Sequence, residues 1–113
     1  MFPLLLALFF SCQESSALLT EAESLHKKGD LAAAIKAYEE VIKENHSVSS
    51  VQKADAQLQK IYTDYAKKLE PKFPEITLNI SRATEQRWPK TVAAEEAQRR
   101  RIRIEEQRKK EQA

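Results

Sequence analysis

Apolar residues recur at spacings of three and four along most of this chain, and polar residues fill the positions between them. That period places the apolar side chains on one face of an α-helix, so the pattern predicts amphipathic helices. Short breaks that carry glycine, proline or serine separate five such segments. The predicted helices span about residues 17–28, 31–45, 51–69, 75–87 and 92–104. We therefore predict an all-α fold, a short stack of about five helices.

Each predicted helix has an apolar face that we expect to be buried. In chain order, these faces consist of Leu18, Leu19, Ala22 and Leu25; Leu31, Ala34, Ile35, Tyr38, Val41 and Ile42; Val51, Ala54, Leu58, Ile61, Tyr62, Tyr65 and Leu69; Phe73, Ile76, Ile80 and Ala83; and Val92, Ala93, Ala97, Ile102 and Ile104. Residues 76–80 also alternate like a strand. We favour a helix there because a lone strand would have no partner.

The first two helices are joined at Gly29-Asp30. Gly29 is the only glycine of the chain, and it suits the left-handed conformation that ends many helices. Asp30 suits the N-cap of the following helix, because its carboxylate accepts hydrogen bonds from free backbone N–H groups. We therefore predict a tight helical hairpin over residues 18–46.

This hairpin resembles a tetratricopeptide repeat. The matching positions are Leu18, Ala22, Leu25, Gly29, Asp30, Ala34, Tyr38 and Val41. His46 stands where the family has a proline, and a generic helical hairpin is the alternative. The resemblance implies a protein-binding module in which the first, third and fifth helices line a shallow concave surface. The candidate partner-binding residues on that surface are Glu21, His26, Gln57 and Asp64. The partner, a protein or peptide, is not readable from the residues.

A single hairpin of this kind cannot bury its own apolar face, so we expect further units along the chain. Residues 45–61 and 88–104 align at an offset of 43, which pairs Ala54 with Ala97 and Ile61 with Ile104. This predicts about two degenerate repeats and a final capping helix. The predicted helical domain therefore spans residues 17–104, and residues 105–113 form a charged helical tail that leaves the core.

Residues 1–11 have the features of an export signal. Residues 2–10 are apolar and too short to span a bilayer, and the chain then turns polar. Phe9-Phe10-Ser11-Cys12 resembles a bacterial lipobox, although Phe9 replaces the usual leucine and no Lys or Arg precedes it. The resemblance implies lipidation of Cys12 as the mature N-terminus and a lipid-anchored protein that faces the periplasm. The alternatives are cleavage near Ser15-Ser16-Ala17, which would release a soluble periplasmic protein, and retention of the segment as an apolar helix.

Charge is unevenly distributed in the chain of 113 residues, although the total is only +2. Residues 13–70 carry a net −2, residues 71–113 carry a net +4, and every arginine lies at or after Arg82. This balance is too weak to indicate nucleic acid binding. Four arginines of the last helix are candidates for contact with an anionic surface: Arg99, Arg100, Arg101 and Arg103. The alternative function is therefore an envelope structural protein that acts at an anionic membrane through its lipid and its basic helix.

Residues with catalytic chemistry are sparse. The two histidines, His26 and His46, have no second ligand at metal-binding spacing, and a single glycine cannot form a phosphate-binding loop. Adjacent glutamates such as Glu39 and Glu40 point in different directions from a helix. We therefore predict a non-enzymatic protein with no cofactor, no metal and no catalytic residues.

Overall fold

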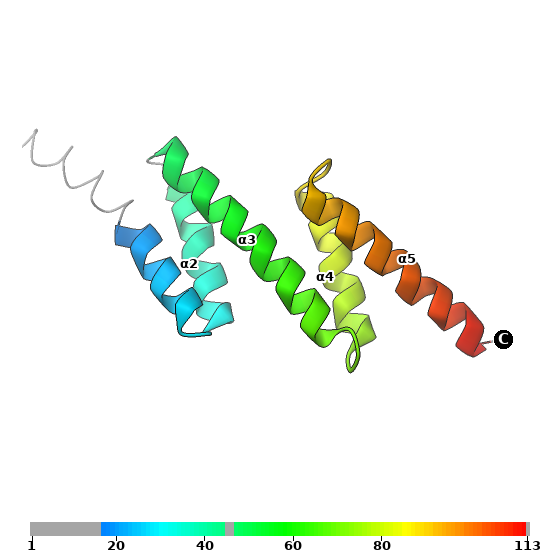
Figure 1. Ribbon diagram of the computed structural model, residues 1–113. Coiled ribbons are helices and arrows are strands. Elements are labelled where there is room, and N and C mark those ends of the chain that lie inside the picture. Colours follow the sequence, from blue (N-terminus) through cyan, green and yellow to red (C-terminus); the bar gives the residue numbers. More distant parts are fainter. Residues whose placement is uncertain (1–16, 45–46, 113) are drawn as a thin grey trace, which may run out of the picture. The chain divides into compact units, whose positions relative to one another are not determined.

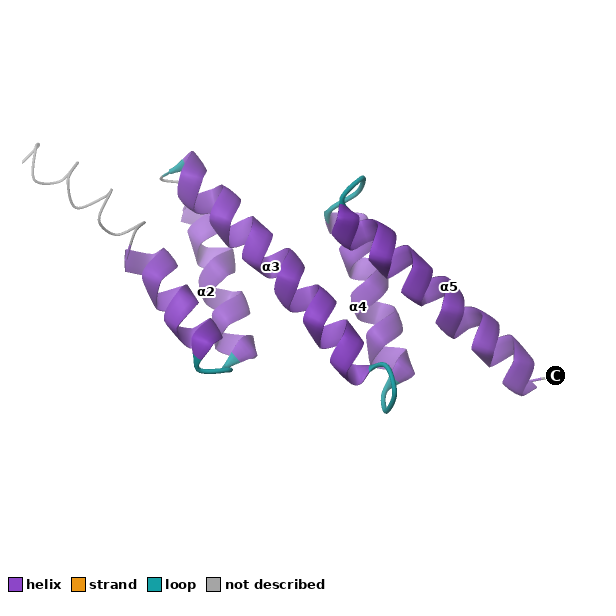
Figure 2. Cartoon of the chain, in the orientation of Figure 1, coloured by secondary structure: helices purple, strands orange, loops and turns teal. Residues whose placement is uncertain are grey.

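The computed structural model describes residues 17–44 and 47–112 of the chain. Over these ranges it consists of five helical segments and contains no strand (Figures 1 and 2). Residues 17–27 form the first segment. The others are α2 (Leu31–Glu44), α3 (Val48–Leu69), α4 (Pro74–Arg87) and α5 (Val92–Gln112). The predicted all-α fold with five helices is confirmed.

The helices fall into two compact units, and the division lies within α3. The first unit ends at Leu58 and the second begins at Gln59. The first unit thus holds the 17–27 segment, α2 and the start of α3. The second holds the rest of α3, α4 and α5.

The hairpin turn of the first unit has the predicted chemistry. Gly29 has a φ of 84°, in the left-handed region. The N–H of Asp30 donates to the carbonyl of Leu25, and the N–H of Gly29 donates to that of His26, both at 3.1 Å. This pair of bonds is a Schellman motif, which satisfies carbonyls that the helix end leaves free. Asp30 then caps α2, because its Oδ1 accepts from the N–H of Ala33 at 3.3 Å.

The interior of the first unit is apolar and follows the predicted faces. Its buried residues are Leu19, Ala22, Ala34, Tyr38, Val41, Ala54 and Leu58. Alanines at three of the buried positions let helix backbones approach closely, and Tyr38 is the largest of the fully buried side chains. Burial of these side chains is the main stabilising contribution that the unit can make.

In the second unit, the loop between α4 and α5 is anchored on α3. Trp88 is buried and meets the ring of Tyr62 edge-on, with centroids 5.0 Å apart. The Thr91 hydroxyl donates to the Trp88 carbonyl at 2.6 Å and accepts from the N–H of Ala94 at 3.1 Å. Thr91 therefore caps α5. The predicted start of this helix near residue 92 is confirmed.

The buried face of α4 differs from the predicted one. The structure buries Thr77, Leu78, Ser81 and Thr84, whereas Phe73 and Ile76 are 50% and 46% exposed. The hydroxyls make this polar face tolerable in the interior: Thr77 donates to the Ala66 carbonyl at 3.2 Å and Thr84 to the Ile80 carbonyl at 2.8 Å. A buried hydroxyl that is hydrogen-bonded loses little on leaving water.

The buried face of α5 also differs from the prediction. Ala94, Ala97, Arg100 and Ile104 are buried, while Val92 and Ile102 are exposed. The helix continues unbroken to Gln112, so residues 105–112 form its last turns. Glu105 accepts a hydrogen bond from Arg82 of α4 at 3.3 Å, which holds this part of the helix against its neighbour.

The two units share one arrangement of buried positions. Helices α2 and α4 are both 14 residues long, and α4 begins 43 positions after α2, at residue 74 against residue 31. The buried residues of the two units correspond at the same offset: Ala34 with Thr77, Tyr38 with Ser81, Val41 with Thr84, and Ala54 with Ala97. The internal repeat expected from the sequence therefore extends to α2 and α4, where no residue identity reveals it.

Candidate binding hollow on the second unit

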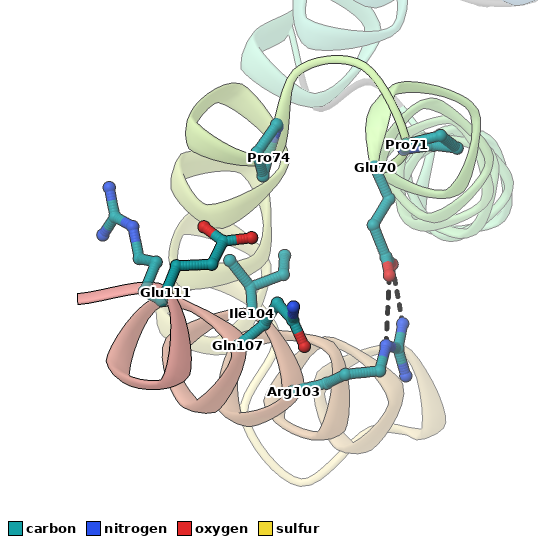
Figure 3. A pocket seen from close by; sticks show the side chains of 8 residues that line it. Glu70, Pro71, Pro74, Arg103, Ile104, Gln107 and Glu111 are labelled. Carbon is teal, nitrogen blue, oxygen red and sulfur yellow. Dashed lines mark hydrogen bonds and ion pairs between the residues drawn. The ribbon is translucent and has the colours of Figure 1, made fainter. Parts of the chain in front are cut away.

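A hollow of about 340 Å³ lies beside the turn between α3 and α4, within the second unit (Figure 3). The turn supplies Glu70, Pro71 and Pro74, and one face of α5 supplies the other side. The residues of that face are Arg103, Ile104, Gln107, Arg108 and Glu111. They share a face because they are spaced by three or four along the helix.

Ion pairs connect the two walls of the hollow. The carboxylate of Glu70 accepts two hydrogen bonds from Arg103, at 2.6 Å from Nη2 and 3.0 Å from Nε (Figure 3). Arg108 pairs with Glu75, at the start of α4. Hydrogen bonding to Glu70 raises the pKa of Arg103. The two-point contact fixes the geometry of both side chains.

The floor of the hollow is apolar. Ile104 is buried at its base, and the rings of Pro71 and Pro74 line the turn. Charged groups of both signs surround this floor at Glu70, Arg103 and Glu111. An apolar floor with a charged rim suits recognition of a side chain of another molecule, with orientation supplied by the rim.

Arg100 lies in the interior of the second unit and is only 4% exposed. Its Nη1 donates to the Ser81 hydroxyl at 3.5 Å, and its Nε lies 3.8 Å from Glu70. Burial lowers the pKa of Arg100, and the nearby Glu70 opposes that effect. The long contacts and the lowered pKa of Arg100 together indicate a guanidinium whose charge is only partly compensated.

The four arginines predicted to contact an anionic surface do not form one exposed set. Arg100 is buried, which corrects its assignment to the surface. Arg101 donates to both carboxylate oxygens of Glu85, at 2.7 and 3.2 Å, and this raises its pKa. Arg103 is held by Glu70, and Arg99 is exposed. Arg101 and Arg103 are paired because Glu85 on α4 and Glu70 after α3 lie opposite them.

The predicted partner-binding residues differ in their exposure to solvent and in the unit to which they belong. His26 faces α2 rather than away from it, because its Nδ1 lies 3.3 Å from the Tyr38 hydroxyl and the two rings meet at a right angle. This corrects its assignment to an outward surface. Glu21 and Asp64 are exposed, and Gln57 is half-buried. Glu21 belongs to the first unit and Asp64 to the second.

The residues that match the repeat signature form the interior of the hairpin. Ala22, Ala34, Tyr38 and Val41 are buried, and Leu18 and Leu25 are partly buried. Burial raises the pKa of the Tyr38 phenol, and the charge of Glu23 acts in the same direction. Cys12 and the predicted signal segment 1–11 lie outside the described residues, as does His46.

In ranges 17–44 and 47–112, no three His, Cys, Asp or Glu side chains are grouped as metal ligands would be. None of the helices in these ranges combines the length and the apolar character that crossing a membrane requires.

Sequence reasoning missed the hollow. The spacing of Arg103, Gln107 and Glu111 marks a common helix face, but nothing in the pattern indicates that the turn at Glu70 packs against it. Comparisons of the chain with protein-family models, with curated proteins and with solved structures give no match.

Proposed function

We propose that this chain is a non-enzymatic interaction module of the bacterial cell envelope, which binds a protein or peptide through tetratricopeptide-like helical hairpins. The observation that carries the proposal is the recurrence of the buried positions of α2 at the same places in α4, 43 residues later. Repeated helical hairpins bury a shared core and leave their remaining faces available for recognition.

The hollow beside Glu70 is the contact site that we propose for the peptide. Its volume of about 340 Å³ lies at the lower end of the range for small-molecule pockets, about 300–1,000 Å³. An apolar side chain of the peptide would cover Ile104 and the two prolines. The charged rim would set the orientation of the peptide more than its affinity.

Anchoring of the module at the membrane is the second part of the proposal. Ser11-Cys12 after an apolar run supports lipidation of Cys12 and a position facing the periplasm. Mass spectrometry of the protein isolated from cells tests this part: the expected product begins at Cys12 and carries lipid mass. A product that retains Met1 would overturn it.

Selection of peptides from a displayed random library against the full chain tests the binding function. The expected peptides perturb the amide signals of Ile104, Gln107 and Glu111 in NMR spectra of the labelled protein. Gln107→Arg should weaken the affinity for these peptides about tenfold, which is about 1.4 kcal/mol, because the arginine fills the hollow and adds a charge to it.

Gln98→Arg is the matched control, because Gln98 is an exposed glutamine of the same helix that does not line the hollow. It should leave the affinity within about twofold of the parent, since a lone surface substitution has little effect. Equal loss in both variants, or a selection that enriches no peptide, would count against the proposed contact site.

One observation favours the rival function of a structural protein acting at an anionic membrane. Arg99, Lys109 and Lys110 are exposed cations on α5, and cations near a membrane surface are attracted to anionic lipid. Vesicles of anionic and of zwitterionic lipid discriminate the two functions. Binding to anionic vesicles that survives Gln107→Arg favours the rival, whereas peptide binding that Gln107→Arg removes favours the interaction module.

A further inference from the structure

A second hollow on the second unit is lined almost entirely by cations. It measures about 220 Å³ and lies between α3 and α5. Its lining residues are Lys67 of α3 and Glu96, Arg99, Arg100 and Arg103 of α5. The four residues of α5 follow one another at spacings of three, one and three, so a single face of the helix presents them. The proposed peptide site shares only Arg103 with this cluster, and the repeat resemblance does not account for the other residues.

Carboxylates neutralise this cluster only in part. Four of the five lining residues are cations, and Glu96 is the one acid among them. Glu70 is the nearest carboxylate outside the lining, and it is shared between Arg103, at 2.6 Å, and Arg100, at 3.8 Å. The cluster therefore keeps a positive charge even after both acids are counted.

Arg100 makes the charge unusual for a surface cluster. Its side chain is buried, yet it lines the hollow. Its hydrogen bond to the Ser81 hydroxyl is long, at 3.5 Å. A guanidinium has five N–H donors, and in a site shielded from water its attraction for an anion is stronger than at an open surface.

The first unit has no equivalent of this cluster. The positions 43 residues before Arg99 and Arg100 are occupied in the first unit by Ala56 and Gln57. The same backbone arrangement is therefore built without a buried cation in the first unit. Packing of the repeat therefore does not require an arginine at position 100, so packing does not explain the buried charge of Arg100.

We propose that the basic hollow binds a phosphoryl group, of the kind that phosphate monoesters and phospholipid headgroups carry. Its volume is below the range for drug-sized ligands, so it suits a single charged group rather than a whole molecule. Arginine forks match the tetrahedral oxygens of a phosphoryl group, and its charge of about −1.5 to −2 at neutral pH complements the residual charge of the cluster.

Titration of the labelled full chain with inorganic phosphate, at constant ionic strength, tests the proposal. NMR signals of Lys67, Arg99, Arg100 and Arg103 should shift along saturable curves. The variants Lys67→Gln and Arg99→Gln should each weaken the affinity about fivefold or more, because each removes a charge-assisted contact worth about 1 kcal/mol or more. Both residues are exposed, so these variants keep the buried packing intact.

Arg82→Gln and Lys109→Gln are the matched controls, because both residues are exposed cations that do not line the hollow. They should change the affinity by less than about twofold, since remote exposed charges are screened by salt. Equal weakening by all four variants would mean non-specific charge screening and would overturn the proposal. Shifts that do not saturate, or that lie away from the hollow, would also overturn it.

Two further probes distinguish the sources of the phosphoryl group. Glycerol phosphate in solution and vesicles that contain phosphatidic acid are compared, with phosphatidylcholine vesicles as the neutral control. Binding of glycerol phosphate that depends on Lys67 and Arg99 identifies a soluble phosphate ester. Binding confined to phosphatidic acid vesicles, with the same dependence, identifies a lipid headgroup. Binding to neither overturns the proposal. The peptide experiment on Gln107 is independent of these outcomes, so failure here leaves the proposed function standing.

Discussion

Arg100 and Tyr38 show how single side chains of this protein depart from the amphipathic pattern. Tyr38 fills the interior of the first unit, and Ser81 takes its place in the repeat of the second. A serine leaves the space that the phenol ring would occupy, and Arg100 reaches the Ser81 hydroxyl from α5. The aliphatic stem of an arginine can pack like an apolar side chain while its charged end finds polar partners. Corresponding places in the two units are thus filled by a tyrosine in the first and by a serine with an arginine in the second.

The stability of Arg100 variants should separate packing from charge. Arg100→Ala should lower the free energy of unfolding by about 2–4 kcal/mol, because it removes buried stem atoms and leaves space around Ser81. Arg100→Met should cost only about 1 kcal/mol, since a long apolar side chain restores the volume and Glu70 keeps Arg103 as its partner. Urea unfolding followed by circular dichroism measures both. Equal losses in the two variants would show that the charge, and not the stem, holds this position.

Alkaline pH should weaken the fold through Tyr38. Burial raises the pKa of its phenol above the ordinary value of 10.0, so the neutral form is favoured in the folded chain. Its contribution to stability is therefore complete below about pH 10 and is lost as the pH rises through the folded value. Tyr38→Phe should fall less in stability than the parent between about pH 9 and pH 11. The exposed Tyr65→Phe is the control and should behave as the parent does. A parallel fall in all three proteins would contradict the assignment.

Among the helices, α4 shows most clearly where sequence reasoning ends. Its ends were predicted within one residue, because Pro74 and Pro89 limit the helix on both sides. Its buried face was predicted wrongly. Phe73, Ile76 and Ile80 lie on one face of the helix, and that face is more hydrophobic than the one that carries the threonines. The structure buries the other face, where the hydroxyls of Thr77 and Thr84 donate hydrogen bonds to backbone carbonyls. A hydroxyl that bonds to the main chain adds little polarity to the surface of a helix.

Two alanine substitutions test the face of α4 that is buried. Leu78 is 1% exposed, so Leu78→Ala should cost about 2–4 kcal/mol. Ile76 is nearly half exposed, so Ile76→Ala should cost less than about 1 kcal/mol. Thermal and urea unfolding of the two variants, which delete side chains of similar size, gives the order directly. The amphipathic pattern alone predicts the opposite order, so a larger loss at Ile76 would overturn the structural assignment.

At the scale of the molecule, the two units use one repeat of about 43 residues with different interiors. The first unit is apolar throughout, and the second has Thr77, Ser81, Thr84 and Arg100 among its buried residues. Equivalent positions thus tolerate large changes in side chain when a neighbour changes with them. The pairs Tyr38 with Gln57 and Ser81 with Arg100 occupy corresponding places, 43 positions apart.

This correspondence predicts coupling between Ser81 and Arg100. Ser81→Tyr alone should destabilise by about 1–3 kcal/mol, because the ring collides with the buried guanidinium. The double variant Ser81→Tyr with Arg100→Gln copies the pair of the first unit and should recover at least about 1 kcal/mol of the sum of the single losses. A double-mutant cycle of unfolding free energies measures the coupling. Strict additivity would mean that the two units do not share the arrangement.

The extent of successful prediction differs between levels of structure. Helix number, most helix ends and the Gly29-Asp30 turn follow from local rules: the period of apolar residues, the missing side chain of glycine and the capping carboxylate of aspartate. The start of α3 is the exception, because the helix begins at Val48, three residues before the predicted position. The apolar interior of the first unit was predicted for the same reason. The candidate site was not, because the turn at Glu70 and the face of α5 at Arg103 are 33 residues apart in the chain, and no local rule brings them together.

The sequence by itself determined that this protein is helical, where its helices break, and how the first hairpin closes. Each of these outcomes depends on neighbours within about one or two helical turns, which the order of residues specifies directly. Only the tertiary structure decided which face of α4 is buried, that Arg100 lies inside, and that two hollows form along α5. Those outcomes depend on side chains from separate helices competing for one interior. Hydrophobicity favours one face of α4. The other face is selected by the hydrogen bonds that the threonine hydroxyls donate and by the one that the Ser81 hydroxyl accepts from the long side chain of Arg100.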